Sequence, residues 1–160
     1  MNTEAIHFAV QLEAAIGLKV KKLKETEPDN AKMLLDMIEL FEHRLETLLR
    51  TVNETPVFDP FELLGDETLW IQASSNLLTT PHDSAKNLTM LWTLCELTEH
   101  SGQFYYQAAA NAPHLSERLF FRSLSEVKKL LYRKLNNVLR TIYNDIWGTI
   151  GFAPFDLTRG

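Results

Sequence analysis

Residues 116–147, SERLFFRSLSEVKKLLYRKLNNVLRTIYNDIW, form the longest of four helical patterns in the chain. Their apolar side chains recur every three or four residues, at Phe120, Leu124, Val127, Leu131 and Leu135. This spacing puts the apolar side chains on one face of an α-helix. The same kind of pattern predicts helices over residues 3–24, 30–51 and 83–111. We find no period-two stretch rich in β-branched residues, so the sequence predicts an all-α protein.

The four predicted helices fall into two pairs. Pro28 and Pro113 lie in the short connections within the pairs, so each pair should form an antiparallel hairpin. Asp66, in the long segment between the pairs, could cap a short helix that ends at about Leu78. Two hairpins joined by a long crossover form a known four-helix arrangement. We therefore predict a single helical-bundle domain over residues 1–160, with a first hairpin (3–51), a partly helical crossover (52–82), a second hairpin (83–147) and an apolar C-terminal tail (148–160).

Composition and charge exclude several classes of protein. The chain has 160 residues, a formal charge of −5 and one cysteine, Cys95, so it has neither a disulfide framework nor a thiolate zinc site. It shows no apolar run of the ~18 residues that a membrane span needs and no secretory leader, and we expect a cytoplasmic protein with no membrane partner. The usual nucleotide-binding and hydrolase motifs are absent. The acidic balance also argues against a nucleic-acid partner.

Two glutamates interrupt apolar stripes on different helices. Glu13 lies among Ile6, Ala9, Val10, Ile16 and Val20, and Glu99 lies among Leu88, Trp92, Cys95, Gly102 and Tyr106. Shifting the chain by 86 residues places Glu13 on Glu99 and continues in register through both helices of each pair. A buried carboxylate must be neutralised, paired or bound to a metal. The alternatives are that both lie at stripe edges and reach water or a basic side chain, or that Tyr106 hydrogen-bonds Glu99.

The stretch EHSGQFYYQAA at residues 99–109, followed by Leu119-Phe-Phe, resembles the third and fourth helices of the ferritin-like superfamily, most closely its rubrerythrin-type members. The resemblance implies a ferritin-like four-helix bundle. Proteins of this class hold two metal ions with a Glu from each of two helices and Glu-x-x-His from each of the other two. In this chain Phe41-x-x-Arg44 and Val127-x-x-Leu130 stand at the Glu-x-x-His positions, and neither pair can ligate a metal. The resemblance therefore implies a degenerate di-metal site that retains Glu13 and Glu99.

Three residues could replace the missing ligands. Glu39 and His43 have the i, i+4 spacing of a ligand pair, and Glu42 lies beside His43. A helical wheel with Phe41 on the core side, however, places Glu39 and His43 toward solvent. We assign Glu42 to an outer acidic face with Asp36, Glu39 and Glu46, and an outer basic face to Arg118, Arg122, Lys129, Arg133 and Arg140. These faces are either solvated or meet between subunits.

Two functional hypotheses follow. The residues favour a divergent bundle that is not an enzyme, needs no cofactor, and acts as a homo-oligomer, preferably a dimer, or as a partner-binding module. The alternative is a metal-dependent oxidoreductase or iron-binding protein with a remodelled site, whose metal ligands would be Glu13, Glu99, Glu39, Glu42 and His43, with iron or another divalent metal. A small-molecule pocket lined by Trp92, Tyr106, Glu13 and Glu99 is a third possibility.

Overall fold

The computed structural model describes residues 3–52, 58–79 and 83–149, and this part of the chain consists of helices and short connections, with no strand. This confirms the prediction of an all-α protein. The elements in chain order are α1 (Thr3–Thr26), the 3-10 turn η1 (Asp29–Ala31), α2 (Lys32–Arg50), α3 (Pro60–Leu64), α4 (Glu67–Leu78), α5 (Ser84–Asn111) and α6 (Leu115–Thr149). None of the helices within these ranges is long and apolar enough to cross a membrane.

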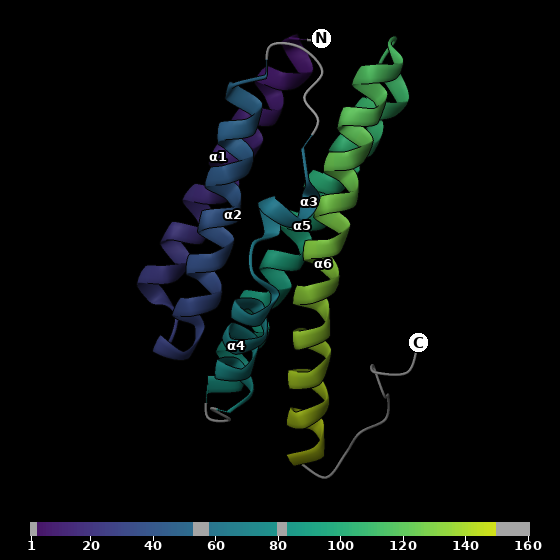
Figure 1. Cartoon of the computed structure of the whole chain (residues 1–160). Helices are drawn as coiled ribbons and strands as arrows, with labels where there is room; N and C mark the ends of the chain where they lie inside the picture. The colour runs from purple at the N-terminus through teal and green to yellow at the C-terminus, as the bar shows by residue number, and fades with distance from the viewer. Residues whose placement is uncertain (1–2, 53–57, 80–82, 150–160) are drawn as a thin grey trace.

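The four long helices form two antiparallel hairpins, as predicted from the short connections (Figure 1). The α1–α2 turn lies at one end of the molecule and the α5–α6 turn at the opposite end (Figure 1). The crossover therefore carries the chain along the length of the molecule before α5 begins. In this arrangement α1 packs against α5, which brings the two hairpins into contact.

The crossover contains two short helices with side-chain caps. The Asp59 carboxylate accepts a hydrogen bond from the Phe61 amide at the start of α3, and Asp66 accepts one from the Thr68 amide at the start of α4, both at 2.9 Å. The second cap confirms the helix predicted from Asp66 to Leu78. Between the two helices, Gly65 has φ of 81°, a left-handed conformation that glycine adopts without strain.

Helix α4 fills the space beside the lower halves of α2 and α6. The indole of Trp70 is buried and donates to the Leu64 carbonyl oxygen at 2.7 Å, which fixes α4 against the end of α3. Lys134 on α6 forms an ion pair with Glu67 on α4. The crossover therefore closes the lower part of the core.

The buried positions of α2 and α6 repeat with the offset of 86 residues found in the sequence. Phe41 and Val127 are fully buried, as predicted for core positions at which metal ligands were expected. The equivalent buried pairs are Leu34 and Phe120, Ile38 and Leu124, Phe41 and Val127, Leu45 and Leu131, and Leu49 and Leu135.

The buried face of α5 differs by one residue from the predicted one. Trp92 and Tyr106, which were assigned to its core stripe, are 55% and 61% exposed, whereas Tyr105 is fully buried. The reason is the close packing of α5 on α6: a Cβ at Gly102 would lie 3.3 Å from Lys128 Cβ, and Ser125 Oγ donates to the Gly102 carbonyl oxygen at 3.2 Å. The pairs that correspond between α1 and α5 are accordingly Ala9 and Leu94, Glu13 and Thr98, Ile16 and Ser101, and Val20 and Tyr105.

The helix ends are close to their predicted positions. Helix α2 begins at Lys32 after the 3-10 turn, and α6 continues to Thr149, so Gly148 is helical and does not open the predicted tail. Residues 150–160 of that tail lie outside the described residues, as do 53–57 and 80–82 of the crossover.

Candidate functional site

Each long helix contributes one side chain to a buried cluster at the centre of the molecule: Glu13 from α1, Glu42 from α2, Tyr105 from α5 and Lys128 from α6. The Lys128 ammonium donates to Glu13 Oε2 at 2.8 Å and to Glu42 Oε1 at 3.1 Å. The Tyr105 hydroxyl donates to Glu13 Oε1 at 2.8 Å. Both oxygens of Glu13 thus have a donor, and we call these four residues the buried cluster.

The buried cluster is shielded from solvent. The Lys128 side chain is 1% exposed, and its Nζ lies 5.3 Å from the centre of the Phe41 ring, a cation–π distance. The two carboxylate side chains are buried as well. An ammonium in such a place is stable only because two carboxyl groups and an aromatic face replace its water.

The protonation of the buried cluster follows from these contacts. Burial raises the pKa of Glu13, but Lys128 and the hydrogen bonds from Glu42, Lys128 and Tyr105 outweigh this effect and hold the pKa below its usual value. Burial raises the pKa of Glu42 well above its usual value, because the attraction of Lys128 is too weak to compensate and Glu13 adds its negative charge. The pKa of Lys128 is raised: burial lowers it, but Glu13 and Glu42 outweigh burial.

These shifts make Glu13 the carboxylate that pairs with the Lys128 ammonium, and they make Glu42 the carboxyl group that keeps its proton to higher pH. Glu42 Oε2 has no hydrogen-bond partner among the described residues. The pKa of Tyr105 is raised well above its usual value by burial and by the Glu13 charge, so its hydroxyl stays a donor.

Two of the five predicted metal ligands, Glu13 and Glu42, lie in the buried cluster. Glu13 is buried, and Glu42 is buried too, so its assignment to the outer acidic face is wrong: it lies beside Phe41 on the core side of α2. Glu99 and His43 are exposed, and Glu39 is paired at the surface with Lys24 at 3.2 Å. Glu99 was expected to face inward. It faces solvent instead, because the buried face of α5 is shifted by one residue from the predicted face.

The residues present do not fit a di-metal centre. Among the described residues, no group of three or more His, Cys, Asp or Glu is placed to hold a metal ion. The Lys128 ammonium lies between the two carboxyl groups, and Phe41 and Val127 fill the core where the resemblance placed two further glutamates.

Sequence reasoning missed Lys128 and chose the wrong tyrosine. Tyr106 was considered as a partner for Glu99, but Tyr105 is the buried residue, and it binds Glu13. One signal could have identified Lys128: the offset of 86 residues that aligns the cores of α2 and α6 also aligns Lys128 with Glu42. The lysine stands directly after Val127, as Glu42 stands after Phe41.

A groove of about 890 Å³ follows the outer side of α5. The rings of Phe8 on α1 and Phe104 on α5, 4.8 Å apart, form part of its wall, and Tyr106 and Tyr132 add aromatic surface. Its charged lining residues are Glu99, Lys128 and Lys129, of which Glu99 and Lys129 are exposed. The predicted small-molecule pocket is only partly present: Tyr106 and Glu99 line this α5 groove, whereas Glu13 belongs to the buried cluster.

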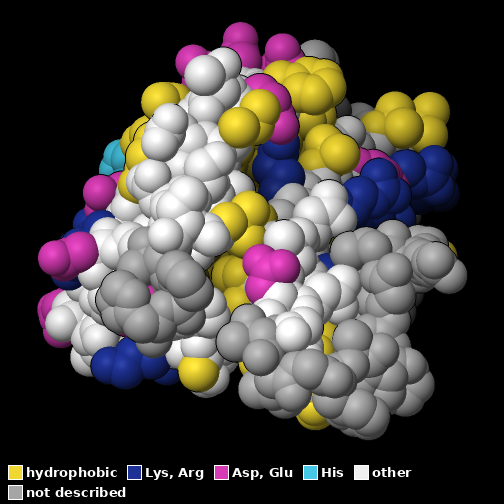
Figure 2. Space-filling model, turned by 90° about the horizontal axis from the view of Figure 1, so that it is seen from below, with side chains coloured by type: hydrophobic (Ala, Val, Ile, Leu, Met, Phe, Trp, Pro, Cys, Tyr) yellow, Lys and Arg dark blue, Asp and Glu magenta, His cyan; other side chains and the backbone are white. Residues whose placement is uncertain are grey.

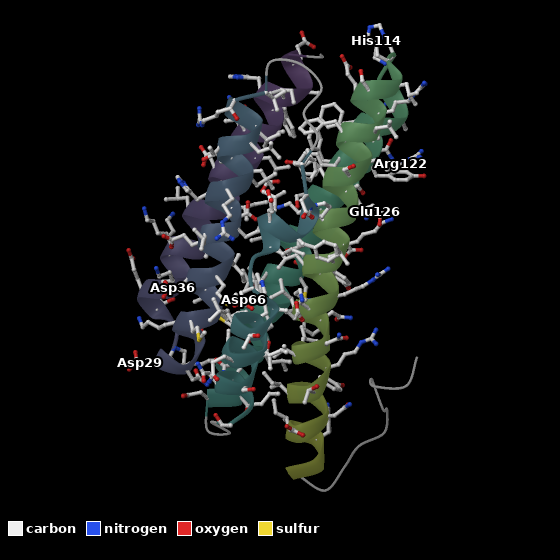
Figure 3. All side chains as sticks on the ribbon, viewed as in Figure 1. Asp29, Asp36, Asp66, His114, Arg122 and Glu126 are labelled. Carbon is white, nitrogen blue, oxygen red and sulfur yellow. The ribbon has the colours of Figure 1, made fainter. Side chains whose placement is uncertain are left out.

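The two charged faces lie on opposite sides of the molecule. Figure 2 shows Lys and Arg side chains gathered on the right-hand side, where α6 lies in Figure 1. In Figure 3, Arg122 points outward from α6, and Asp36 lies on the opposite side, on α2. The acidic face is partly neutralised within the chain, because Lys24 pairs with Asp36 at 2.5 Å and Arg50 pairs with Glu46 at 2.7 Å. Arg118, Arg122, Lys129 and Arg133 of the basic face are exposed, and Arg140 is partly buried.

Cys95 is a buried thiol on α5. Burial and the nearby charge of Glu99 raise the pKa of Cys95 to about 12. Because the thiolate is the reactive form, this cysteine is a poor nucleophile.

No protein-family profile, no curated protein and no solved structure matches this chain. The features from which a function can be inferred are therefore the buried cluster and the α5 groove.

Proposed function

We propose that the chain is a divergent ferritin-like four-helix bundle in which the Lys128 ammonium takes the place of the metal ions. In this proposal it is not an enzyme. It acts as a homodimer or a partner-binding module through its surface. The observation that carries the proposal is the position of Lys128 Nζ between Glu13 and Glu42, on three different helices.

The architecture supports the ferritin-like part of the proposal. Two antiparallel hairpins with a long crossover are one of the recognised four-helix arrangements, and bundle proteins of this class carry inward carboxylates on facing helices. A carboxylate pair in a dry core needs a positive charge. Lys128 supplies that charge from the chain itself, and the aromatic ring of Phe41 completes its surroundings.

The metal content of the purified protein distinguishes this proposal from the metal-dependent alternative. We expect iron, manganese and zinc, measured by elemental analysis after expression in metal-supplemented medium, to be well below one equivalent per chain. The reason is that a divalent cation would have to displace a lysine hydrogen-bonded to both carboxyl groups.

Near-stoichiometric metal that is lost in Glu13→Gln but retained in Glu99→Gln would contradict this expectation. Glu99 is the matched control, because it was a predicted ligand but is exposed. Metal lost equally from both variants would indicate the remodelled site around Glu13 and Glu99.

The α5 groove supports the homodimer. Trp92, Glu99 and Tyr106 recur every seven residues on α5 and therefore share one face of the helix. That face exposes large aromatic surface, which marks interaction sites in soluble proteins. The groove contains Glu99 and Lys129, so a two-fold axis can place Glu99 of one copy near Lys129 of the other. The charged faces are less suitable, because surfaces on opposite sides of the molecule would meet head to tail.

Tyr106→Glu is expected to weaken this dimer by about 30-fold or more in its dissociation constant, or about 2 kcal/mol. The substitution adds a charge to an aromatic contact that excludes water. Sedimentation velocity over a range of protein concentrations measures the effect. Ile71→Glu on α4 is the control, since Ile71 is 59% exposed and lies outside the α5 groove. A monomeric wild type, or equal weakening by both variants, would exclude this interface.

A further inference from the structure

We propose that Lys128 forms an intramolecular isopeptide bond with Glu42, which would join α6 to α2 covalently. The three groups that such a bond requires are present: an amine, a carboxyl group as acceptor, and a second carboxylate to move the protons. They are held together in the dry interior. This modification goes beyond the proposed function, and it starts from the same Lys128 ammonium, which the bond consumes.

The geometry places the nucleophile at its acceptor. Lys128 Nζ lies 3.1 Å from Glu42 Oε1, so the nitrogen contacts the carboxyl group whose carbon it would attack. Glu13 Oε2, at 2.8 Å from the same nitrogen, is in position to take its proton. Tyr105 and the Lys128 ammonium hold Glu13 at both oxygens, so the proton acceptor is fixed in place.

The protonation of the buried cluster suits the reaction. The acceptor must be a carboxylic acid, because a carboxylate resists attack, and Glu42 is the member of the pair that keeps its proton. The ammonium first gives one proton to Glu13, which leaves a neutral amine beside a neutral acid. This proton transfer leaves the total number of protons in the cluster unchanged, so it needs no change of pH.

The bond-forming step balances without a co-reactant. The Nζ lone pair attacks Glu42 Cδ, the C–OH bond breaks, and the hydroxyl leaves with one amine hydrogen as water. The products are the Lys128–Glu42 amide, one water molecule and a protonated Glu13. Charge is conserved, since the ion pair with Glu13 becomes two neutral groups.

The surroundings favour the amide over the separated groups. In bulk water, hydration of the free amine and carboxylate favours hydrolysis. Here the groups are buried, and fixed intramolecular reactants reach effective concentrations of about 10⁵–10⁸ M. The amide also removes two charged or ionisable groups from the core, where charge is costly. Because the neutral amine is the minor form, we expect the bond to accumulate slowly after folding.

Intact-mass spectrometry of the purified full chain, during incubation at neutral pH, tests the proposal. We expect a species lighter than the sequence mass by one water molecule, whose fraction rises with time. Trypsin digestion should then release peptide 33–44 covalently linked to peptide 123–129. The second peptide extends past residue 128 because trypsin does not cleave after a modified lysine. This linked peptide distinguishes the proposed bond from loss of water elsewhere.

The variants separate the roles of the three groups. Lys128→Met and Glu42→Met should abolish the linked peptide, and Glu13→Gln should slow its formation by about 10²-fold or more, the range of a lost general base. Lys129→Met, which alters the exposed neighbouring lysine, should form the bond at the wild-type rate. Circular dichroism confirms the fold of each variant. A wild-type mass that stays at the sequence value throughout incubation, or a linked peptide that survives in Glu42→Met, would overturn the proposal.

Discussion

Replacing Lys128 with methionine is expected to lower the free energy of unfolding by about 3–5 kcal/mol, the range measured when one partner of a buried ion pair is removed. Methionine fills a similar volume but carries no charge, so Glu13 would be left as a carboxylate without a cation and would have to take up a proton. Urea denaturation at neutral pH measures the loss. This loss is large, because the total free energy of unfolding of a native protein is only about 5–15 kcal/mol.

Two further variants separate loss of charge from loss of packing. Lys129→Met changes the exposed neighbour and should alter stability by less than about 0.5 kcal/mol. The triple variant Lys128→Met, Glu13→Gln, Glu42→Gln leaves no buried charge, and its two amides can bond to each other and to the Tyr105 hydroxyl. We expect it to recover most of the lost stability. A triple variant as unstable as Lys128→Met would show that lysine packing, and not unpaired charge, is decisive.

Helices α2 and α6 were predicted well because their amphipathic pattern is strong. Most of their large apolar residues lie on the buried face, so the pattern identifies that face correctly. Helix α5 has the reverse distribution. Its core side includes the small or polar residues Thr98, Ser101 and Gly102, whereas its exposed side carries Trp92 and Tyr106. The hydrophobic pattern of α5 therefore predicted a core face that is shifted by one residue from the face that is buried.

The sequence predicted the burial of Glu13 but not that of Lys128 or Glu42, because a local pattern reports only on its own helix. Glu13 could be found because it lies in the middle of an apolar stripe on its own helix. The burial of Lys128 depends on carboxyl groups from α1 and α2, which are distant in sequence. A local pattern contains no such information, and a lysine next to Lys129 in a charged helix is typical of a solvated face. Glu42 was misplaced because it borders Phe41 at the edge of the stripe.

Glu42→Gln is expected to raise the free energy of unfolding at neutral pH and to flatten its dependence on pH. Folding raises the pKa of Glu42 well above its usual value of 4.5, so above that pH the folded state holds a proton that the unfolded state has released. Wild-type stability should therefore fall as pH rises, by about 1.4 kcal/mol per unit, until the folded pKa is reached. Glutamine mimics the protonated acid: its amide can donate to Glu13 and its oxygen can accept from Lys128.

The other groups that face Glu42 titrate outside this range. Glu13 has a lowered pKa, so its contribution to stability is lost only as pH falls below its usual value. Lys128 and Tyr105 have raised pKa values, and each of them changes charge only above its usual value of 10.5 or 10.0. Between the usual pKa of Glu42 and its raised value in the folded state, the slope from the buried cluster therefore belongs to Glu42. Glu27, whose pKa is raised by burial at the end of the α1–α2 hairpin, adds a contribution of the same sign, so Glu27→Gln is the control. Urea denaturation across this range, on protein of full sequence mass, should give a much smaller slope for Glu42→Gln, in which the contribution of Glu27 remains, and most of the wild-type slope for Glu27→Gln. An unchanged slope in Glu42→Gln would mean that Glu42 is ionised in the folded protein, and that the buried cluster carries a net negative charge.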